Sequence, residues 1–355
     1  MKWFKKSKPS DLNTEEAHAL TYLAQQDVDN AAAYLTRVDG EGDTNKNTTS
    51  QAALIHSYVP LGLSDCKSWQ LQPSSSLKKQ FASPHANIKH IVAIASGKGG
   101  VGKSTTCVNM ARALKAMGAQ VGILDADIYG PSIPTMLGMP EAHPDSLDGK
   151  IMQPIVSSEG VKANSIGFLV DENDATVWRG PMASKALQQL FNETAWGELD
   201  YLLIDLPPGT GDIQLTIAQS LPISGHVIVS TPQDIALIDA KKALSMFEKV
   251  LIPALGLVEN MNMHICENCG HESAIFGHMG AQNYAKKVEL PFLGSAPLNI
   301  DIRQYMDEPK QQLLIKQAFF SHYENIALRM TIELAKLAQA NDASEQQVIP
   351  ITQLS

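Results

Sequence analysis

The stretch that decides the fold reads IVAIASGKGGVGKST and runs from residue 91 to residue 105. Its first five residues are apolar, as expected of a strand buried on both faces. The pattern G-x-x-x-x-G-K-S follows from Gly97 to Ser104, and a helical pattern then continues to residue 117, just before Gly118. A strand, a glycine-rich turn and a helix in this order predict a loop that binds phosphate groups.

The chemistry of this loop comes from its backbone N–H groups and from two side chains. Lys103 brings a full positive charge to the β- and γ-phosphates, and the Ser104 hydroxyl is the expected Mg²⁺ ligand. Lys98 is a second lysine in the same loop. It is either a solvated lysine beside a phosphate or a lysine aimed at a nucleotide held by a second subunit. The predicted nucleotide-binding residues are Gly97, Lys98, Gly99, Gly100, Val101, Gly102, Lys103, Ser104 and Thr105.

Outward from the loop, short apolar runs alternate with longer helical patterns. The apolar runs are 91–95, 121–124, 201–204, 227–229, 255–258 and 292–293. The helical patterns are 103–117, 183–191, 213–219, 235–250 and 317–340. This alternation predicts an α/β fold with a doubly wound, mostly parallel sheet.

The first part of the chain has a different character. A polar, glycine-bearing stretch at 40–51 reads as a linker, and it separates two short helical pieces within 11–34 from two candidate strands at 53–59 and 68–72. We therefore expect a small N-terminal appendage over 1–85, partly disordered or degenerate. A nucleotide-binding domain over 86–340 and a polar tail over 341–355 complete the predicted organisation.

Three aspartates follow apolar runs at the edge where parallel sheets bind ligands. Asp205 comes directly after 201–204 and before the glycine- and proline-rich run LPPGTGD, so we predict that it holds Mg²⁺ through water. Asp127 belongs to the run DAD after 121–124 and is expected beside it. Asp125, in the same run, is expected to orient its neighbours.

Cys266 and Cys269 form a C-x-x-C pair followed by Gly270, which resembles a metal-binding knuckle. A redox pair normally opens a helix, whereas here Gly270 and a loop expected at 260–263 favour a turn. Zinc and iron–sulfur sites usually take four ligands. His264 and His271 could complete a zinc site, two chains could share four thiolates, or the turn could hold no metal. We favour the shared site.

Composition limits the partners and the compartment. The 355 residues carry a formal net charge of −9, which disfavours nucleic acid as a partner because its backbone attracts basic surfaces. No apolar run approaches the roughly 20 residues that span a bilayer. Four cysteines are too few for a disulfide scaffold in a chain of this length, so we expect a cytoplasmic protein. Cys107 is expected to be a small buried residue of the first helix, and Cys66 lies alone in the appendage.

Several long motifs occur in a fixed order: GKGGVGKST, LDADIYGPSIPTMLG, VWRGPMASKAL, DLPPGTGDIQLT, STPQDIALIDAKK and CENCG. Over about residues 88–340 the chain resembles the Mrp/ApbC iron–sulfur cluster carriers. These belong to the ParA/MinD/nitrogenase-iron-protein class of dimeric ATPases. The resemblance implies a P-loop NTPase fold and a cytosolic homodimer that hydrolyses ATP. It further implies a labile [4Fe-4S] cluster that passes to apoproteins, with assembly scaffolds as further partners.

The resemblance also implies roles for matching residues of the nucleotide site. Lys98 would reach the phosphates of the partner subunit, while Lys103 and Ser104 would be the ordinary lysine and hydroxyl of the loop. Asp127 would position the attacking water, and Asp205 would be the Walker B residue.

Outside the loop, the resemblance implies that Asn260 contacts adenine and that Cys266 and Cys269 ligate a bridging cluster. The alternative is a MinD- or ParA-like positioning ATPase whose cysteines hold structural zinc. A MinD-like role needs a basic amphipathic tail, yet residues 337–355 contain no lysine or arginine. A ParA-like role needs a basic surface, which the acidic composition disfavours.

Overall fold

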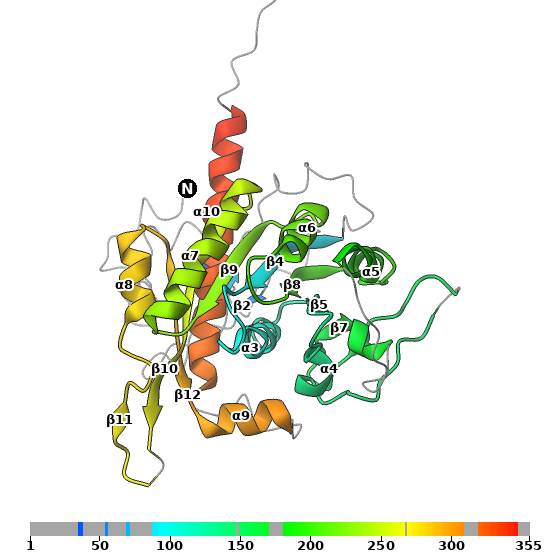
Figure 1. The fold of residues 1–355 in the computed structure, drawn as a ribbon. Coiled ribbons are helices and arrows are strands. Elements are labelled where there is room, and N and C mark those ends of the chain that lie inside the picture. Colours follow the sequence, from blue (N-terminus) through cyan, green and yellow to red (C-terminus); the bar gives the residue numbers. More distant parts are fainter. Residues whose placement is uncertain are drawn as a thin grey trace, which may run out of the picture.

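The computed structural model describes residues 35–37, 54–55, 69–71, 87–146, 149–169, 180–266, 268–308 and 319–346. Within this part of the chain, a nine-stranded sheet lies between helices on both faces (Figure 1). Its strand order is β11-β10-β9-β4-β8-β5-β7-β6, with β12 beside β10. Consecutive strands are not always neighbours, as expected of a doubly wound sheet.

The central strands are parallel, and short antiparallel strands close the path at both ends. The parallel strands are β4 (Ile88–Ala95), β5 (Val121–Asp125), β7 (Lys162–Ser165), β8 (Leu199–Asp205), β9 (Gly225–Ser230), β10 (Ala254–Ile265) and β12 (Phe292–Leu298). The antiparallel strands are β6 (Ile155–Val156) and β11 (Glu272–Ser273).

Helices cover each face of the sheet and bury a separate apolar core there. One core includes side chains from α3 (Lys103–Ala116), α4 (Ile133–Met136), α9 (Ile300–Asp307) and α10 (Phe320–Gln346). The other includes side chains from α5 (Gly180–Asn192), α6 (Asp212–Ser220), α7 (Asp234–Lys249) and α8 (Gly280–Lys287).

Strand β4 shows how one sequence serves both cores. Val92 and Ile94 point to the α3 side, whereas Ile91, Ala93 and Ala95 point to the α7 side. Successive side chains of a strand alternate between faces, so a strand buried on both sides must be apolar at every position. This explains why the run at 91–95 lacks the polar alternation of a half-exposed strand.

The predicted α/β sheet is confirmed, and each of the six predicted strands is present. The loop predicted at 260–263 is wrong, because β10 continues through Ile265. Its second half pairs with β12 and β11, with Asn260 opposite Ala296 and His264 opposite both Leu298 and Ser273. These pairings bring together segments far apart in the sequence, so local composition does not reveal them.

In the N-terminal part, the two predicted strands are confirmed as β2 (Leu54–Ile55) and β3 (Trp69–Leu71). With β1 (Leu35–Arg37) they form a three-stranded antiparallel sheet of order β1-β3-β2. The predicted helical pieces within 11–34 and the linker at 40–51 lie outside the described residues. In the described part of the chain, no helix combines the length and apolarity needed to cross a membrane.

Candidate functional site

The loop between β4 and α3 has the backbone shape of a phosphate cradle, and two of its glycines are required by close contacts. Gly102 has φ of 82°, and a Cβ atom there would lie 2.0 Å from Asn260 Nδ2. At Gly97, a Cβ atom would lie 2.1 Å from the backbone carbonyl carbon of Asp239 in α7. The loop is therefore held between β10 and α7, and larger residues at these positions would displace it.

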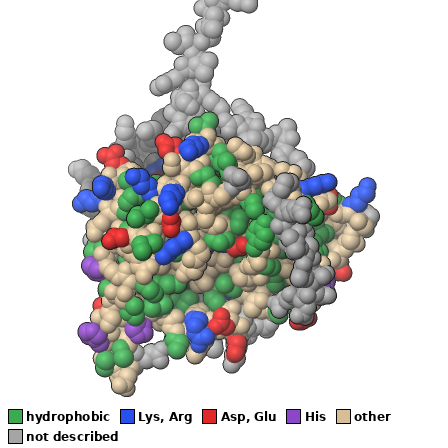
Figure 2. All heavy atoms as spheres, viewed as in Figure 1, with side chains coloured by type: hydrophobic (Ala, Val, Ile, Leu, Met, Phe, Trp, Pro, Cys, Tyr) green, Lys and Arg blue, Asp and Glu red, His purple; other side chains and the backbone are tan. Residues whose placement is uncertain are grey.

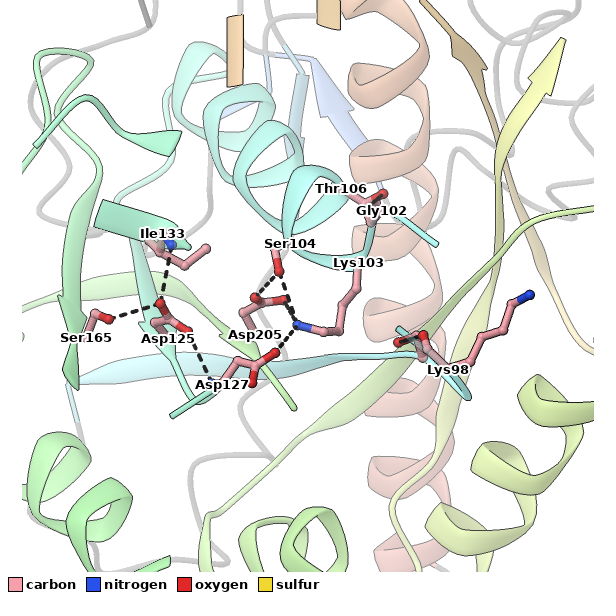
Figure 3. Close-up of polar contacts among 11 residues, drawn as sticks. Lys98, Gly102, Lys103, Ser104, Thr106, Asp125, Asp127, Ile133, Ser165 and Asp205 are labelled. Atoms are coloured by element: carbon pink, nitrogen blue, oxygen red, sulfur yellow. Dashed lines mark hydrogen bonds and ion pairs between the residues drawn. The ribbon is translucent and has the colours of Figure 1, made fainter. Parts of the chain in front are cut away.

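Four of the predicted site residues meet at the start of α3 (Figure 3). Lys103 Nζ lies 2.8 Å from Asp205 Oδ1 and 3.9 Å from Asp127 Oδ2. Ser104 Oγ donates a hydrogen bond of 2.6 Å to Asp205 Oδ2. The P-loop lysine and serine thus contact residues at the carboxyl ends of two neighbouring strands, β5 and β8.

The electrostatics of this cluster explain which ions it can bind. Asp205 and Asp127 lie beside the Lys103 ammonium group, and Asp125 adds a negative charge beyond ion-pair distance. Burial, and then the charge of Asp205, raise the pKa of Asp125 to about 7. Burial also raises the pKa of Asp127, although the Lys103 charge opposes it. For Lys103 burial lowers the pKa, but the charge and hydrogen bond of Asp205 raise it overall.

An excess of carboxylates over cations favours an added positive charge. A hydroxyl oxygen and carboxylate oxygens are the ligands that Mg²⁺ prefers. Ser104 Oγ and Asp205 Oδ2 already lie within hydrogen-bond distance of each other. The donor set therefore fits Mg²⁺ bound together with a phosphate in the cradle.

Lys98 does not join this cluster. Its side chain points away from Lys103 and the aspartates (Figure 3), and its Nζ donates to Gln233 Oε1 over 3.4 Å. Gln233 is the N-cap residue of α7. Within one chain, Lys98 therefore lies apart from the aspartates that face Lys103.

Asn260 lies on β10, directly beside the cradle. It is 4% exposed, and its Nδ2 donates a hydrogen bond of 2.9 Å to the carbonyl oxygen of Val101. The structure thus places this residue against the predicted phosphate loop, and its contact with adenine stays a prediction.

The two cysteines lie in the turn between β10 and β11, as the C-x-x-C-G pattern predicts. Cys266 N donates to His271 O over 2.9 Å, and Gly270 N donates to Cys266 O over 2.8 Å. Gly270 has φ of 69°, a conformation that favours glycine. Cys269 is exposed and Cys266 is partly exposed. Figure 2 shows histidine side chains at the lower left, where Figure 1 places this hairpin.

The described residues do not form the zinc site that His264 and His271 could complete with the two cysteines. Among the described residues, no group of three or more His, Cys, Asp or Glu side chains is arranged to hold a metal ion. His264 instead places its Nδ1 3.3 Å from the carbonyl oxygen of Leu298. Cys107 is fully buried in α3, which confirms that prediction, and Cys66 lies outside the described residues.

Sequence reasoning missed Ser165 and Gln233. Ser165 ends β7, a strand whose sequence KANS has no apolar alternation, and its Oγ donates to Asp125 Oδ2 over 2.9 Å. No local signal marks such a residue, since its partner lies 40 positions away. Gln233 lies inside the quoted run STPQDIALIDAKK, but its contact with Lys98 depends on how α7 packs against the loop.

Comparisons with known proteins point to one family. The family model described as "ParA: NUBPL iron-transfer P-loop NTPase" matches residues 87–331. The "Iron-sulfur cluster carrier protein" of Salmonella typhimurium is 55% identical over 270 residues, which cover 75% of this chain and 73% of that protein.

Solved structures agree with the fold. A nucleotide-binding protein of Archaeoglobus fulgidus in complex with ADP matches with a TM-score of 0.56 and 39% identity, covering 62% of this chain and 86% of that one. The cell division ATPase MinD of Pyrococcus furiosus matches with a TM-score of 0.52 and 21% identity, covering 70% and 99%. At this identity the second match shows a shared fold alone.

Proposed function

Because the chain belongs to the NUBPL family of iron-transfer P-loop NTPases, we propose that it is an ATP-hydrolysing carrier that binds a labile [4Fe-4S] cluster between two copies and passes it to apoproteins. One observation carries the proposal. The same strand, β10, contacts the phosphate cradle through Asn260 and leads directly into the cysteine turn at Cys266.

The nucleotide half of the function follows from the charges around the cradle. Ser104 and Asp205 would hold Mg²⁺, and the backbone N–H groups of the loop would bind the phosphate oxygens. Lys103 exchanges its ion pair with Asp205 for contacts with the β- and γ-phosphates. Asp127 follows the carboxyl end of β5, faces Lys103, and orients the attacking water.

The cluster half requires a second chain. Cys266 and Cys269 supply two thiolates, whereas a [4Fe-4S] cluster takes four. A two-fold axis beside the turn would bring the same two cysteines of a second chain to the cluster, which gives four thiolates. Lys98 also favours a second chain at the nucleotide site, because its side chain points away from the carboxylates of its own chain.

Anaerobic reconstitution with iron and sulfide tests the proposal. The expected product is a dimer with about four iron and four acid-labile sulfide per two chains. It should transfer its cluster to an apoprotein and hydrolyse ATP. About one zinc per chain with no labile sulfide would contradict the carrier function.

The MinD- or ParA-like alternative is not retained. The relatives at about 55% identity are named as iron–sulfur cluster carriers, whereas MinD at 21% identity shares the fold alone. A positioning ATPase also gives no reason for a cysteine turn on the strand that contacts the nucleotide loop.

A further inference from the structure

We propose that Ser165 is a positioning residue for ATP hydrolysis. Its hydroxyl orients the Asp125 carboxylate, which holds both ends of the loop 126–132 that carries Asp127. This inference rests on the proposed ATPase function and adds a residue to it. Ser165 ends β7, is fully buried, and contacts Asp125 from the neighbouring strand β5 (Figure 3).

The Asp125 carboxylate holds the loop at two points. Its Oδ1 accepts a hydrogen bond of 3.1 Å from the backbone N–H of Asp127, near the start of the loop. Its Oδ2 accepts one of 3.3 Å from the backbone N–H of Ile133, where the loop ends and α4 begins. One buried carboxylate therefore sets the path of residues 126–132.

Ser165 sets the orientation of that carboxylate. Its Oγ donates a hydrogen bond of 2.9 Å to Asp125 Oδ2, which is shorter than the bonds from Asp127 N and Ile133 N. The same Oγ accepts a hydrogen bond of 3.0 Å from the backbone N–H of Gly167. The serine hydroxyl is thus fixed from one side and directs its proton at Asp125 on the other.

The segment after Ser165 also packs against the loop. A Cβ atom built on Gly167 would lie 3.2 Å from Pro131 Cβ and 3.2 Å from Pro134 Cγ. The 3-10 helix Ile166–Phe168 therefore supports the far end of the loop while Ser165 fixes its clamp. Asp127, at the near end, is the side chain that faces Lys103.

Loss of the hydroxyl should affect the chemical step more than binding. The phosphates are held by the cradle and Lys103, neither of which contacts Ser165. Asp127, in contrast, must be placed to within a fraction of an ångström to orient a water molecule. Ser165→Ala should lower kcat by about five- to twentyfold and change the Kd for MgATP by less than about twofold.

A matched control lies in the same part of the sheet. Ser157 is also a buried serine, and its Oγ accepts a hydrogen bond of 3.1 Å from Val161 N in the β6–β7 hairpin. Ser157→Ala removes a comparable hydroxyl without touching Asp125. It should keep kcat within about twofold of the wild-type value, with a similar change in melting temperature.

The experiment measures steady-state ATPase activity, MgATP affinity and thermal melting for the full chain. A selective loss of kcat in Ser165→Ala, with recovery of most of it in Ser165→Thr, supports the role. Equal effects of Ser165→Ala and Ser157→Ala, or loss of MgATP binding in parallel with kcat, overturn it. A large drop in melting temperature for Ser165→Ala alone also overturns it, because the hydroxyl then acts on stability.

The wild-type chain separates this inference from the proposed function. A wild-type chain without ATPase activity overturns both. An active wild-type chain whose kcat is insensitive to Ser165→Ala overturns the inference alone.

Discussion

At the scale of single residues, close contacts and charge decide what the nucleotide site can do. The Lys103 ammonium group pairs with Asp205 and faces Asp127, so phosphate binding must compensate for the ion pair with Asp205. Glycine is required at position 97 because α7 leaves no space for a Cβ atom beside it. Lys103, Asp205 and Gly97 were all predicted from the sequence, since each belongs to a local pattern with a fixed spacing.

The steric requirement at Gly97 can be tested by stability. Gly97→Ala places a Cβ atom 2.1 Å from the Asp239 carbonyl carbon, so the loop and α7 must separate. We expect the free energy of unfolding to fall by about 2–4 kcal/mol, together with a loss of nucleotide binding. Gly99→Ala is the control, because a Cβ atom there has only Pro208 within 4 Å, at 3.9 Å. Urea denaturation of both variants without nucleotide provides the measurement, and equal losses would refute the steric account.

The cysteine turn allows a second test at this scale. Cys266→Ala removes one partly exposed thiol and should abolish cluster binding, while the Kd for ATP changes by less than about threefold. Cys107→Ala removes a thiol that is buried in α3 and should retain the cluster. Iron and sulfide analysis after anaerobic reconstitution, paired with nucleotide titration, distinguishes the two. Loss of nucleotide binding in Cys266→Ala would assign the turn a structural role instead.

At the scale of elements, β10 and β7 show where sequence reasoning works and where it stops. The apolar part of β10 at 255–258 was predicted, because a strand buried on both faces has a local signature. Its continuation to Ile265 was not, since polar residues become strand there only by pairing with β12 and β11. Strand β7 and its Ser165 were missed for the same reason. The nucleotide-loop residues were therefore predictable, whereas the supports that orient Asp127 were not.

Helix α10 carries a pH-sensitive group. Glu324 is 8% exposed, and burial raises the pKa of its carboxyl group to about 7 from an ordinary value of 4.5. The folded state therefore holds this proton more tightly than the unfolded state, so stability from this group is lost as pH rises from about 4.5 to 7. Glu324→Gln should remove about 1–3 kcal/mol of this pH dependence.

Denaturation at pH 5 and pH 8 checks this prediction. The variant should gain stability relative to wild type at pH 8 more than at pH 5. Glu333→Gln is the control on the same helix, because Glu333 is less buried and pairs with Lys336 at 3.0 Å. An unchanged pH dependence in Glu324→Gln would show that this carboxyl is not the source.

At the scale of the whole molecule, two features are incomplete within one chain. Lys98 contacts Gln233 rather than the carboxylate cluster, and the cysteine turn offers half of the thiolates that a cluster takes. The homodimer that we propose would complete both features, with each nucleotide site combining Asp127 of one chain with Lys98 of the other.

A mixing experiment tests whether Lys98 acts across the dimer. Lys98→Ala and Asp127→Asn should each be inactive alone. In a mixed dimer, the Lys98→Ala chain keeps its own Asp127 and receives Lys98 from its partner. Equal mixing should therefore restore about a quarter of wild-type ATPase activity, because about half of the dimers are mixed and each has one intact site. No recovery, with exchange of chains verified, would place Lys98 in its own chain's site.

The length of β10 has a further consequence for how this protein can vary. Asn260, beside the cradle on β10, and Cys266, in the turn directly after β10 ends at Ile265, are six positions apart. The pairing of β10 with β12 shifts register between Asn260 and His264, and Met261 has φ of 58°, so this segment spans less than the roughly 20 Å of six fully extended residues. Within the regular part of β10 after this irregularity, inserting one residue would turn the thiolates to the opposite face, and deleting two would shorten the distance from Asn260 by up to about 7 Å. Insertions and deletions should therefore be tolerated beyond the turn but not between Asn260 and Cys266.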